Sequence, residues 1–249
     1  MTVMRSLIGV IVAVLLSASS AMAGAFEDGE AAYKLKGYGT ALRLFRPLAE
    51  QGDARAQVYL GWMYFYGEGV QEDVTEAAKW FSKAADEGSA EGEDELGWFY
   101  DMGWGVPMDR ARAQKLYRLA AEQGYAPAQF RVGYTYTVKG DGQDFIEAAK
   151  WFRKAAEQGD GDAQFQLGIL YYHGNGVPKD NVQAYMWFSL AAARGITGFP
   201  DLPSEDRRDW VIKLPSEMTP DQIAEAQRLA REWKPTSGQS SPTPSRLYK

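Results

Sequence analysis

Apolar residues recur along this chain with the spacing of amphipathic helices, and the pattern returns about every 36 residues. Within residues 54–66, Ala56, Gly61 and Tyr64 fall on one helical face. A second apolar stripe follows in residues 77–85, after a short polar stretch. Each period is therefore predicted to contain a pair of helices joined by a turn.

Three series of residues carry this period independently. Glycines that close an Ala-rich run lie 35 or 36 residues apart. Another glycine lies inside the first helix of each pair, with a tyrosine three residues later, and an aromatic residue marks the second helix. The series are Gly52, Gly88, Gly124, Gly159 and Gly195; Gly61, Gly97, Gly133 and Gly168; and Phe45, Phe81, Tyr117, Phe152 and Phe188. Three series with one period identify a repeat array.

Turn and cap residues mark the helix boundaries. Gly-x-Gly-Val turns follow the first helix at residues 67–70, 103–106 and 174–177. An aspartate precedes each second helix and is predicted to accept hydrogen bonds from the first turn. Three of these helices also carry Glu or Gln at the position that completes a capping box. The aspartates are Asp73, Asp109, Asp144 and Asp180, and the box residues are Glu76, Glu147 and Gln183. The mid-helix glycines predict a close approach of the paired helices.

The residues resemble Sel1-like repeats, relatives of the tetratricopeptide repeats. The shared pattern is A-x-A-Q, L-G-x-x-Y, G-x-G-V, D and A-x-x-W-F-x-K-A-A-x-x-G, which residues 54–88 follow nearly throughout. The resemblance implies an all-α fold, a right-handed α/α superhelical solenoid of stacked helix-turn-helix repeats. Two repeats depart from the pattern. Residues 90–95 read Ala-Glu-Gly-Glu-Asp-Glu in place of A-x-A-Q, and residues 139–142 lack one residue and the Val.

The ends of the chain differ from the array. Arg5, an apolar run over residues 7–16 and a closing Ala-Met-Ala are typical of a secretory signal, with cleavage expected after Ala23. We therefore expect a periplasmic or secreted protein without a membrane span after cleavage; an uncleaved anchor is the alternative. Thr219-Pro220 is predicted to start a closing helix. The predicted organisation is a signal at 1–23, a partial repeat at 24–53, repeats at 54–89, 90–125, 126–160 and 161–195, capping helices at 196–234 (one over 204–214), and a disordered Pro- and Ser-rich tail at 235–249.

The composition excludes several kinds of functional site. The chain has no cysteine, one histidine and a net charge of −6. Disulfides and thiolate metal sites are therefore excluded, and a broad nucleic-acid-binding face is not expected. The Gly-x-Gly turns lack the Lys-Ser/Thr of phosphate loops, and Asp141, Asp144 and Glu147 do not have calcium-loop spacing. There is no Ser-x-x-Lys motif. We expect no catalytic residue, metal or cofactor, and hence no enzyme, in a protein that is monomeric.

The first helices of such repeats line the concave face of the solenoid, as the resemblance implies. Trp62, Trp98, Tyr134 and Ile169 share one position there, and acidic residues of the second repeat flank them. The alternative is that these rings pack between neighbouring helices. The predicted partner-binding groove contains Tyr59, Trp62, Tyr66, Glu91, Asp94, Trp98, Asp101, Tyr134 and His173.

This groove favours a protein–protein interaction scaffold, adaptor or regulator of the bacterial envelope that binds a partner peptide or protein. A tryptophan beside a carboxylate is also a common arrangement in carbohydrate-binding sites. A cell-wall glycan-binding protein therefore stays open as an alternative, followed by an enzyme acting on the cell wall or on β-lactams.

Overall fold

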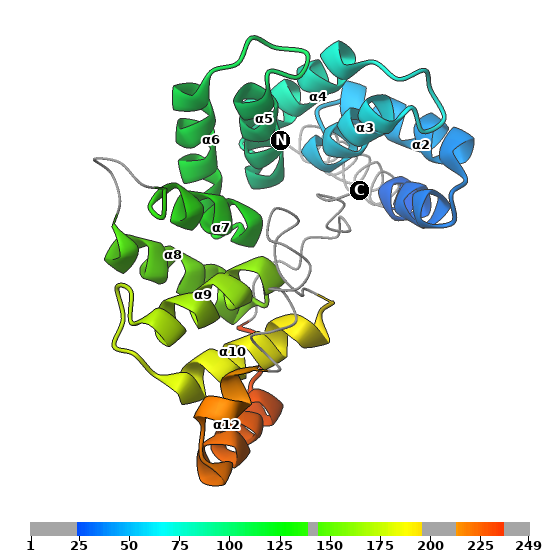
Figure 1. The fold of residues 1–249 in the computed structure, drawn as a ribbon. Helices are drawn as coiled ribbons and strands as arrows, with labels where there is room; N and C mark the ends of the chain where they lie inside the picture. The colour runs from blue at the N-terminus through cyan, green and yellow to red at the C-terminus, as the bar shows by residue number, and fades with distance from the viewer. Residues whose placement is uncertain (1–23, 139–143, 196–212, 237–249) are drawn as a thin grey trace, which may run out of the picture. The chain divides into compact units, whose positions relative to one another are not determined.

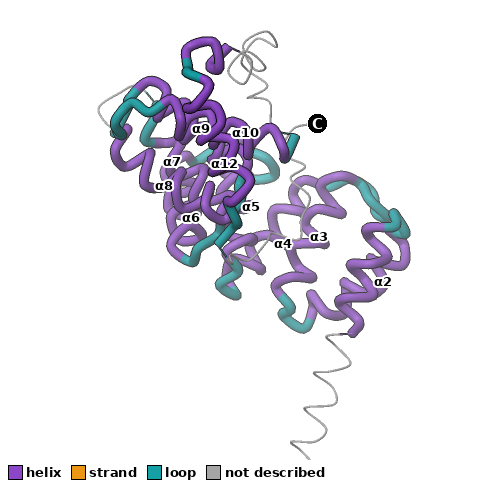
Figure 2. Tube along the Cα trace, turned by 90° about the horizontal axis from the view of Figure 1, so that it is seen from below, coloured by secondary structure: helices purple, strands orange, loops and turns teal. Residues whose placement is uncertain are grey.

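The computed structural model describes residues 24–138, 144–195 and 213–236, which form helices joined by short turns (Figure 1, Figure 2). No residue in these ranges lies in a strand, so the predicted all-α class is confirmed. A first helix covers residues 24–34. The labelled helices are α2 (Tyr38–Glu50), α3 (Ala54–Tyr66), α4 (Val74–Asp86), α5 (Ala90–Met102), α6 (Arg110–Glu122), α7 (Ala126–Thr135), α8 (Phe145–Gln158), α9 (Gly161–His173), α10 (Asn181–Ala193), η1 (Leu214–Glu217) and α12 (Pro220–Glu232).

Some predicted features lie outside the described residues. They are the signal at 1–23, the irregular turn at 139–142, most of the helix expected at 204–214, and the tail after Thr236.

The chain forms two compact units, Met1–Leu116 (unit 1) and Tyr117–Lys249 (unit 2), and the boundary falls inside α6. In unit 1, helices α2, α3, α4 and α5 pack in chain order, each against the next. In unit 2, α7, α8, α9 and α10 do the same, and α12 packs on α10. Consecutive helix pairs therefore stack as a solenoid within each unit, as the repeat period predicts.

Aspartate caps begin the second helices as predicted, but the capping boxes do not form there. Asp73 accepts the Glu76 N–H at 2.9 Å, while the Glu76 carboxylate bonds Lys79 instead of reaching back to the cap. Glu147 likewise pairs with Lys150. The box prediction was therefore wrong at Glu76 and Glu147, because a lysine three residues on competes for the same carboxylate, and no box is formed at Gln183 either. A complete box is present only at α12, between Thr219 and Gln222, within the described residues.

Gly61, Gly133 and Gly168 each lie against an aromatic ring of the paired helix, which confirms the predicted close approach at these three positions. A Cβ on Gly61 would lie 2.5 Å from the Phe81 ring, and one on Gly168 would lie 2.6 Å from Phe188. The second glycine of the Gly-x-Gly turn has a similar role between repeats. A Cβ on Gly105 would lie 2.4 Å from the Val74 carbonyl oxygen. These turns serve repeat stacking.

Two polar links recur between a second helix and the first helix of the next repeat. The Gln of A-x-A-Q donates its amide N–H to the carbonyl eight residues earlier, at 3.0 Å in Gln57, 3.2 Å in Gln129 and 3.1 Å in Gln164. An arginine also donates to the motif tyrosine 18 residues later. These pairs are Arg46 with Tyr64, Arg118 with Tyr136 and Arg153 with Tyr171. The Gln and Tyr of the motif are therefore structural.

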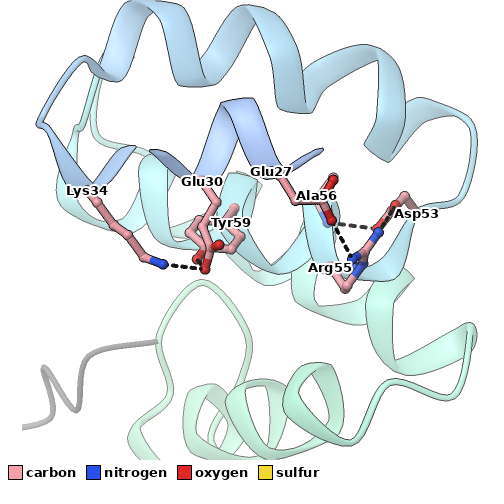
Figure 3. Close-up of polar contacts among 7 residues, drawn as sticks. All are labelled: Glu27, Glu30, Lys34, Asp53, Arg55, Ala56 and Tyr59. Atoms are coloured by element: carbon pink, nitrogen blue, oxygen red, sulfur yellow. Dashed lines mark hydrogen bonds and ion pairs between the residues drawn. The ribbon is translucent and has the colours of Figure 1, made fainter. Parts of the chain in front are cut away.

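Polar contacts fasten the first helix to α3 (Figure 3). The Tyr59 hydroxyl donates to Glu30 at 3.1 Å, and Lys34 pairs with the same carboxylate at 2.9 Å. Phe26 and Tyr33 are buried in this region. Phe26 adds an apolar contact one turn before Glu30.

At the other end, α12 covers the apolar side of α10. Ala226 is fully buried, and the Trp233 ring lies 6.4 Å from that of Trp187. The chain then returns to α8, where the Thr236 N–H donates to the Glu157 carbonyl at 2.8 Å. The first two residues of the predicted tail are thus placed on the repeat array.

Candidate functional site

The predicted groove residues are divided between the two units. On unit 1, α3 carries three of them and α5 carries four. On unit 2, Tyr134 lies on α7 and His173 at the end of α9. The unit 1 set holds seven of the nine residues and is therefore the larger candidate surface.

Burial separates the predicted residues into three groups. Tyr59, Trp62 and Asp94 are buried, with 3%, 7% and 1% of their surface exposed. Glu91, Trp98 and Asp101 are half-buried, and Tyr66, Tyr134 and His173 are exposed. Tyr59 stacks on Phe45 at 4.6 Å between ring centroids, so this ring packs between helices.

Rings from α3, α5 and the turn after α5 form one continuous group, here called the α3/α5 aromatic cluster. Trp62 stacks on Tyr66 at 5.5 Å and lies 6.1 Å from Trp98. Trp98 meets Trp104 edge to face at 4.5 Å. Its members are Trp62, Phe65, Tyr66, Trp98, Phe99 and Trp104. The sequence analysis did not place Trp104 in the groove; an aromatic residue at the variable position of a Gly-x-Gly turn is the signal for it.

Two large apolar side chains at this cluster remain accessible. Tyr66 is 37% exposed and Met102 is 51% exposed. Met102 lies four residues after Trp98 on α5, so the two share one helical face. The buried rings thus carry an exposed apolar rim.

Acidic residues occupy the first two turns of α5. They replace the A-x-A-Q pattern, so Glu93 stands at the register of Gln57 and Asp94 at that of Val58. Glu93, Asp94 and Glu95 are 7%, 1% and 5% exposed. Asp94 was predicted to face the groove, but it is buried, because it occupies the position that the buried Val58 has in the first full repeat. The α5 N-terminus favours negative charge through the helix dipole.

The net negative charge of the chain lies in one unit. Residues 1–116 hold 17 acidic and 11 basic side chains, whereas residues 117–249 hold 16 of each. The net charge of −6 therefore belongs to unit 1, which also carries the α3/α5 aromatic cluster.

Unit 2 presents a smaller and mixed surface. The Tyr134 ring lies 6.3 Å from Phe130, and Tyr172 meets His173 edge to face at 5.0 Å. The Tyr172 hydroxyl donates to Glu217 at 3.0 Å, and this hydrogen bond raises the Tyr172 pKa. The lone histidine is thus an exposed neighbour of Tyr172.

Asp160 is the N-cap of α9, and the pKa of its carboxyl group lies well above the usual value. Burial raises its pKa to about 7, and the nearby Asp162 carboxylate adds to the shift. The Ala163 N–H, which donates to Asp160 at 2.7 Å, and the charges of Arg131 and Arg194 act in the opposite direction. The cause is desolvation.

Across the described ranges, no group of three or more His, Cys, Asp or Glu side chains is arranged to hold a metal ion. None of the helices in these ranges is both long and apolar enough to cross a membrane.

Comparison with known proteins decides the class of repeat. The Sel1 repeat model matches residues 18–53, 54–89, 90–125, 126–160 and 161–196. The chain belongs to the Sel1 repeat family. The resemblance expected from the sequence motif is thereby confirmed. No curated protein matches the chain.

A solved structure of a Sel1 repeat protein supports this membership. A Sel1 repeat protein from Oxalobacter formigenes is 34% identical with a TM-score of 0.63, over 71% of this chain and 49% of that one. This chain thus spans about half the length of that relative. Immunity protein Pa5087 from Pseudomonas aeruginosa is 18% identical with a TM-score of 0.50, over 80% of this chain and 82% of that one. The second likeness concerns the fold alone.

Proposed function

We propose that this Sel1 repeat protein is a non-enzymatic scaffold that binds a segment of a partner protein on the α3/α5 aromatic cluster. The observation that carries the proposal is the exposed rim of Tyr66 and Met102 above rings that are held by one another. Large apolar side chains on rigid supports are typical anchors of protein interfaces.

The cluster is well suited to binding because its rings are already ordered. Trp98 contacts Trp62, Phe65, Phe99 and Trp104. Binding therefore costs little additional side-chain entropy, and the area buried on Tyr66 and Met102 stabilises the complex.

A protein segment fits this surface better than a glycan does. Sugar rings stack on an open aromatic face, but Tyr66 covers a face of Trp62 with an interplanar angle of 14°. Trp98 is surrounded by other rings. Glycan binding is the second candidate, supported by the carboxylates Glu91 and Asp101, which lie on the same helix as Trp98. Sedimentation with peptidoglycan separates the candidates: wild-type protein is expected in the supernatant.

The proposed location is the bacterial periplasm or the exterior, following cleavage after Ala23. Support comes from Arg5, the apolar run and the small residues before Gly24. N-terminal sequencing of the fractionated protein should find Gly24 first. An intact Met1 in the membrane fraction would contradict this location.

Site-specific photocrosslinking tests the binding surface directly. A photoreactive residue at Met102 should give a discrete adduct with a partner protein in cells. The matched control is Leu35, which is also apolar and 84% exposed in unit 1 but far along the chain from the cluster. Adducts of equal yield at both positions, or none at Met102, would refute the proposed surface.

A further inference from the structure

We propose that Met102 and Met108 form a paired methionine oxidation site, at which a peroxide converts both thioethers to sulfoxides and so weakens partner binding on the α3/α5 aromatic cluster. The effect on binding rests on the proposed function, whereas the chemical modification does not. Three observations in unit 1 carry the inference: the accessibility of the two side chains, their place on one turn, and the residues at the same positions of other repeats.

Accessibility separates the methionines of this chain into two groups. Five methionines lie in the ranges that the structure describes. Met63, Met186 and Met218 are at most 9% exposed, whereas Met102 and Met108 are 51% and 64% exposed. Because an oxidant in solution must reach the thioether sulfur, it reacts first with the two exposed side chains.

One turn holds the two exposed methionines together. Met102 ends α5, and Met108 lies two residues before α6. The Asp109 N–H donates to the Tyr100 carbonyl at 2.8 Å and closes the turn. A Cβ on Gly103, the neighbour of Met102, would lie 3.3 Å from the Met108 Cβ. The backbone therefore places both methionines on the turn that also contributes a ring to the α3/α5 aromatic cluster.

The repeat fold does not require methionine at either position. A Cβ on Gly67 would lie 3.4 Å from the Glu72 Cβ, and one on Gly174 would lie 3.2 Å from the Lys179 Cβ, so the same close approach recurs in two other turns. The residues equivalent to the methionine pair are Tyr66 with Glu72 and His173 with Lys179. Polar side chains thus fit these turns, and a polar sulfoxide is compatible with the fold.

The reaction transfers one oxygen atom to each sulfur. The sulfur lone pair attacks one oxygen of hydrogen peroxide, and the S–O bond forms as the O–O bond breaks. The proton on the transferred oxygen passes to the leaving hydroxide, which becomes water. Each thioether is thereby oxidised to a sulfoxide, and the peroxide is reduced.

Oxidation changes the surface that a partner covers. A methionine thioether is apolar and adapts its shape to a partner, whereas the sulfoxide oxygen is polar and accepts hydrogen bonds from water. Burying that oxygen without a donor costs free energy. Since Met102 and Met108 are exposed in the unbound protein, oxidation should lower the affinity for a partner without unfolding the chain.

Peptide mapping by mass spectrometry, after limited treatment of the folded full chain with hydrogen peroxide, tests the site. Met102 and Met108 should gain oxygen at least about tenfold faster than Met63, Met186 and Met218. The control is the urea-unfolded chain, in which all five should react at similar rates. Equal rates in the folded chain, or resistance of either Met102 or Met108, would overturn the inference.

Photocrosslinking from Tyr66 measures the effect on binding and leaves both methionines in place. A photoreactive residue there should form a partner adduct in cell extract. Oxidation of the purified chain, followed by removal of the peroxide, should lower the adduct yield several-fold, and methionine sulfoxide reductases should restore it. The matched variant, Met102→Leu with Met108→Leu, keeps apolar side chains but cannot form sulfoxides, so its yield should not change. Melting curves verify folding.

The outcomes distinguish this inference from the proposed function. If Met102 and Met108 are oxidised but the wild-type yield is unchanged, or the leucine variant loses as much, the effect on binding is refuted and the proposed function stands. If neither Tyr66 nor Met102 gives an adduct in untreated protein, the proposed function and the effect on binding both fail. Peptide mapping then decides the oxidation site by itself.

Discussion

At the residue scale, one position shows how a single substitution distinguishes the second repeat. Gln57, Gln129 and Gln164 each donate an amide N–H to a carbonyl of the preceding helix. Glu93 stands at the same register, where the corresponding carbonyl is that of Ala85. A carboxylate has no N–H to donate there. The second repeat therefore gives up a structural bond and gains negative charge.

Glu93→Gln should restore that bond and raise the free energy of unfolding by about 1 kcal/mol. The reverse exchange, Gln129→Glu, removes the donor from unit 2 and should destabilise by roughly 1–3 kcal/mol. Urea midpoints of the two variants and wild type provide the comparison. If Glu93→Gln is destabilising, the register-based interpretation of this position is incorrect.

A second residue-scale prediction concerns the mid-helix glycine. Gly61→Ala should destabilise unit 1 by about 1–3 kcal/mol, because the added methyl overlaps the buried Phe81 ring. Gly39→Ala is the control: Gly39 is also helical, but a Cβ there meets nothing within 4 Å. The control should gain up to about 1 kcal/mol from helix propensity. Equal urea midpoints for the two variants would contradict the close-packing explanation.

At the scale of elements, periodicity predicted the helices well and side-chain choices less well. The first full helix was expected over residues 54–66 and is found as Ala54–Tyr66. The capping boxes failed where lysine competed for Glu76 and Glu147. Helix α7 ends at Thr135 after 10 residues. The corresponding helices α3 and α5 have 13 residues each, with Gly67 and Gly103 as their C-caps. Local patterns predict where helices lie, but not which of two partners a side chain selects.

The cap of α9 makes stability depend on pH. The pKa of Asp160 is raised to about 7 from an ordinary value of 3.8, so the folded protein holds this proton more tightly than the unfolded chain does. Its contribution to stability is present at low pH and is lost as pH rises from about 4 to about 7. Asp160→Asn keeps an acceptor at the cap and removes the titration.

Melting temperatures at about pH 4.5 and pH 8 test this effect. The fall between the two values should be smaller for Asp160→Asn than for wild type, and the variant should be the more stable protein at the higher pH. An identical fall in both proteins would show that Asp160 does not couple folding to pH.

At the scale of the whole molecule, the sequence predicted the family and the all-α class, but not which of the rings assigned to the groove would be accessible. Trp62 and Tyr59 are buried because α3 packs on both sides, against α2 and α4, whereas Tyr66 in its last turn remains exposed. The division into two units could not be predicted from the repeat period, since the boundary falls within α6. Charge and rings nevertheless coincide in unit 1.

The most direct test of a binding surface on α3 and α5 is the affinity of the partner captured at Met102. The measurement is a titration of that partner against wild type and the double variant Tyr66→Ser, Met102→Ser, with folding checked by thermal melts. The Tyr66 ring also packs on Trp62, so the variant should melt at a somewhat lower temperature than wild type but remain folded, and it should bind at least about tenfold more weakly. Unchanged affinity in the folded variant would contradict the account.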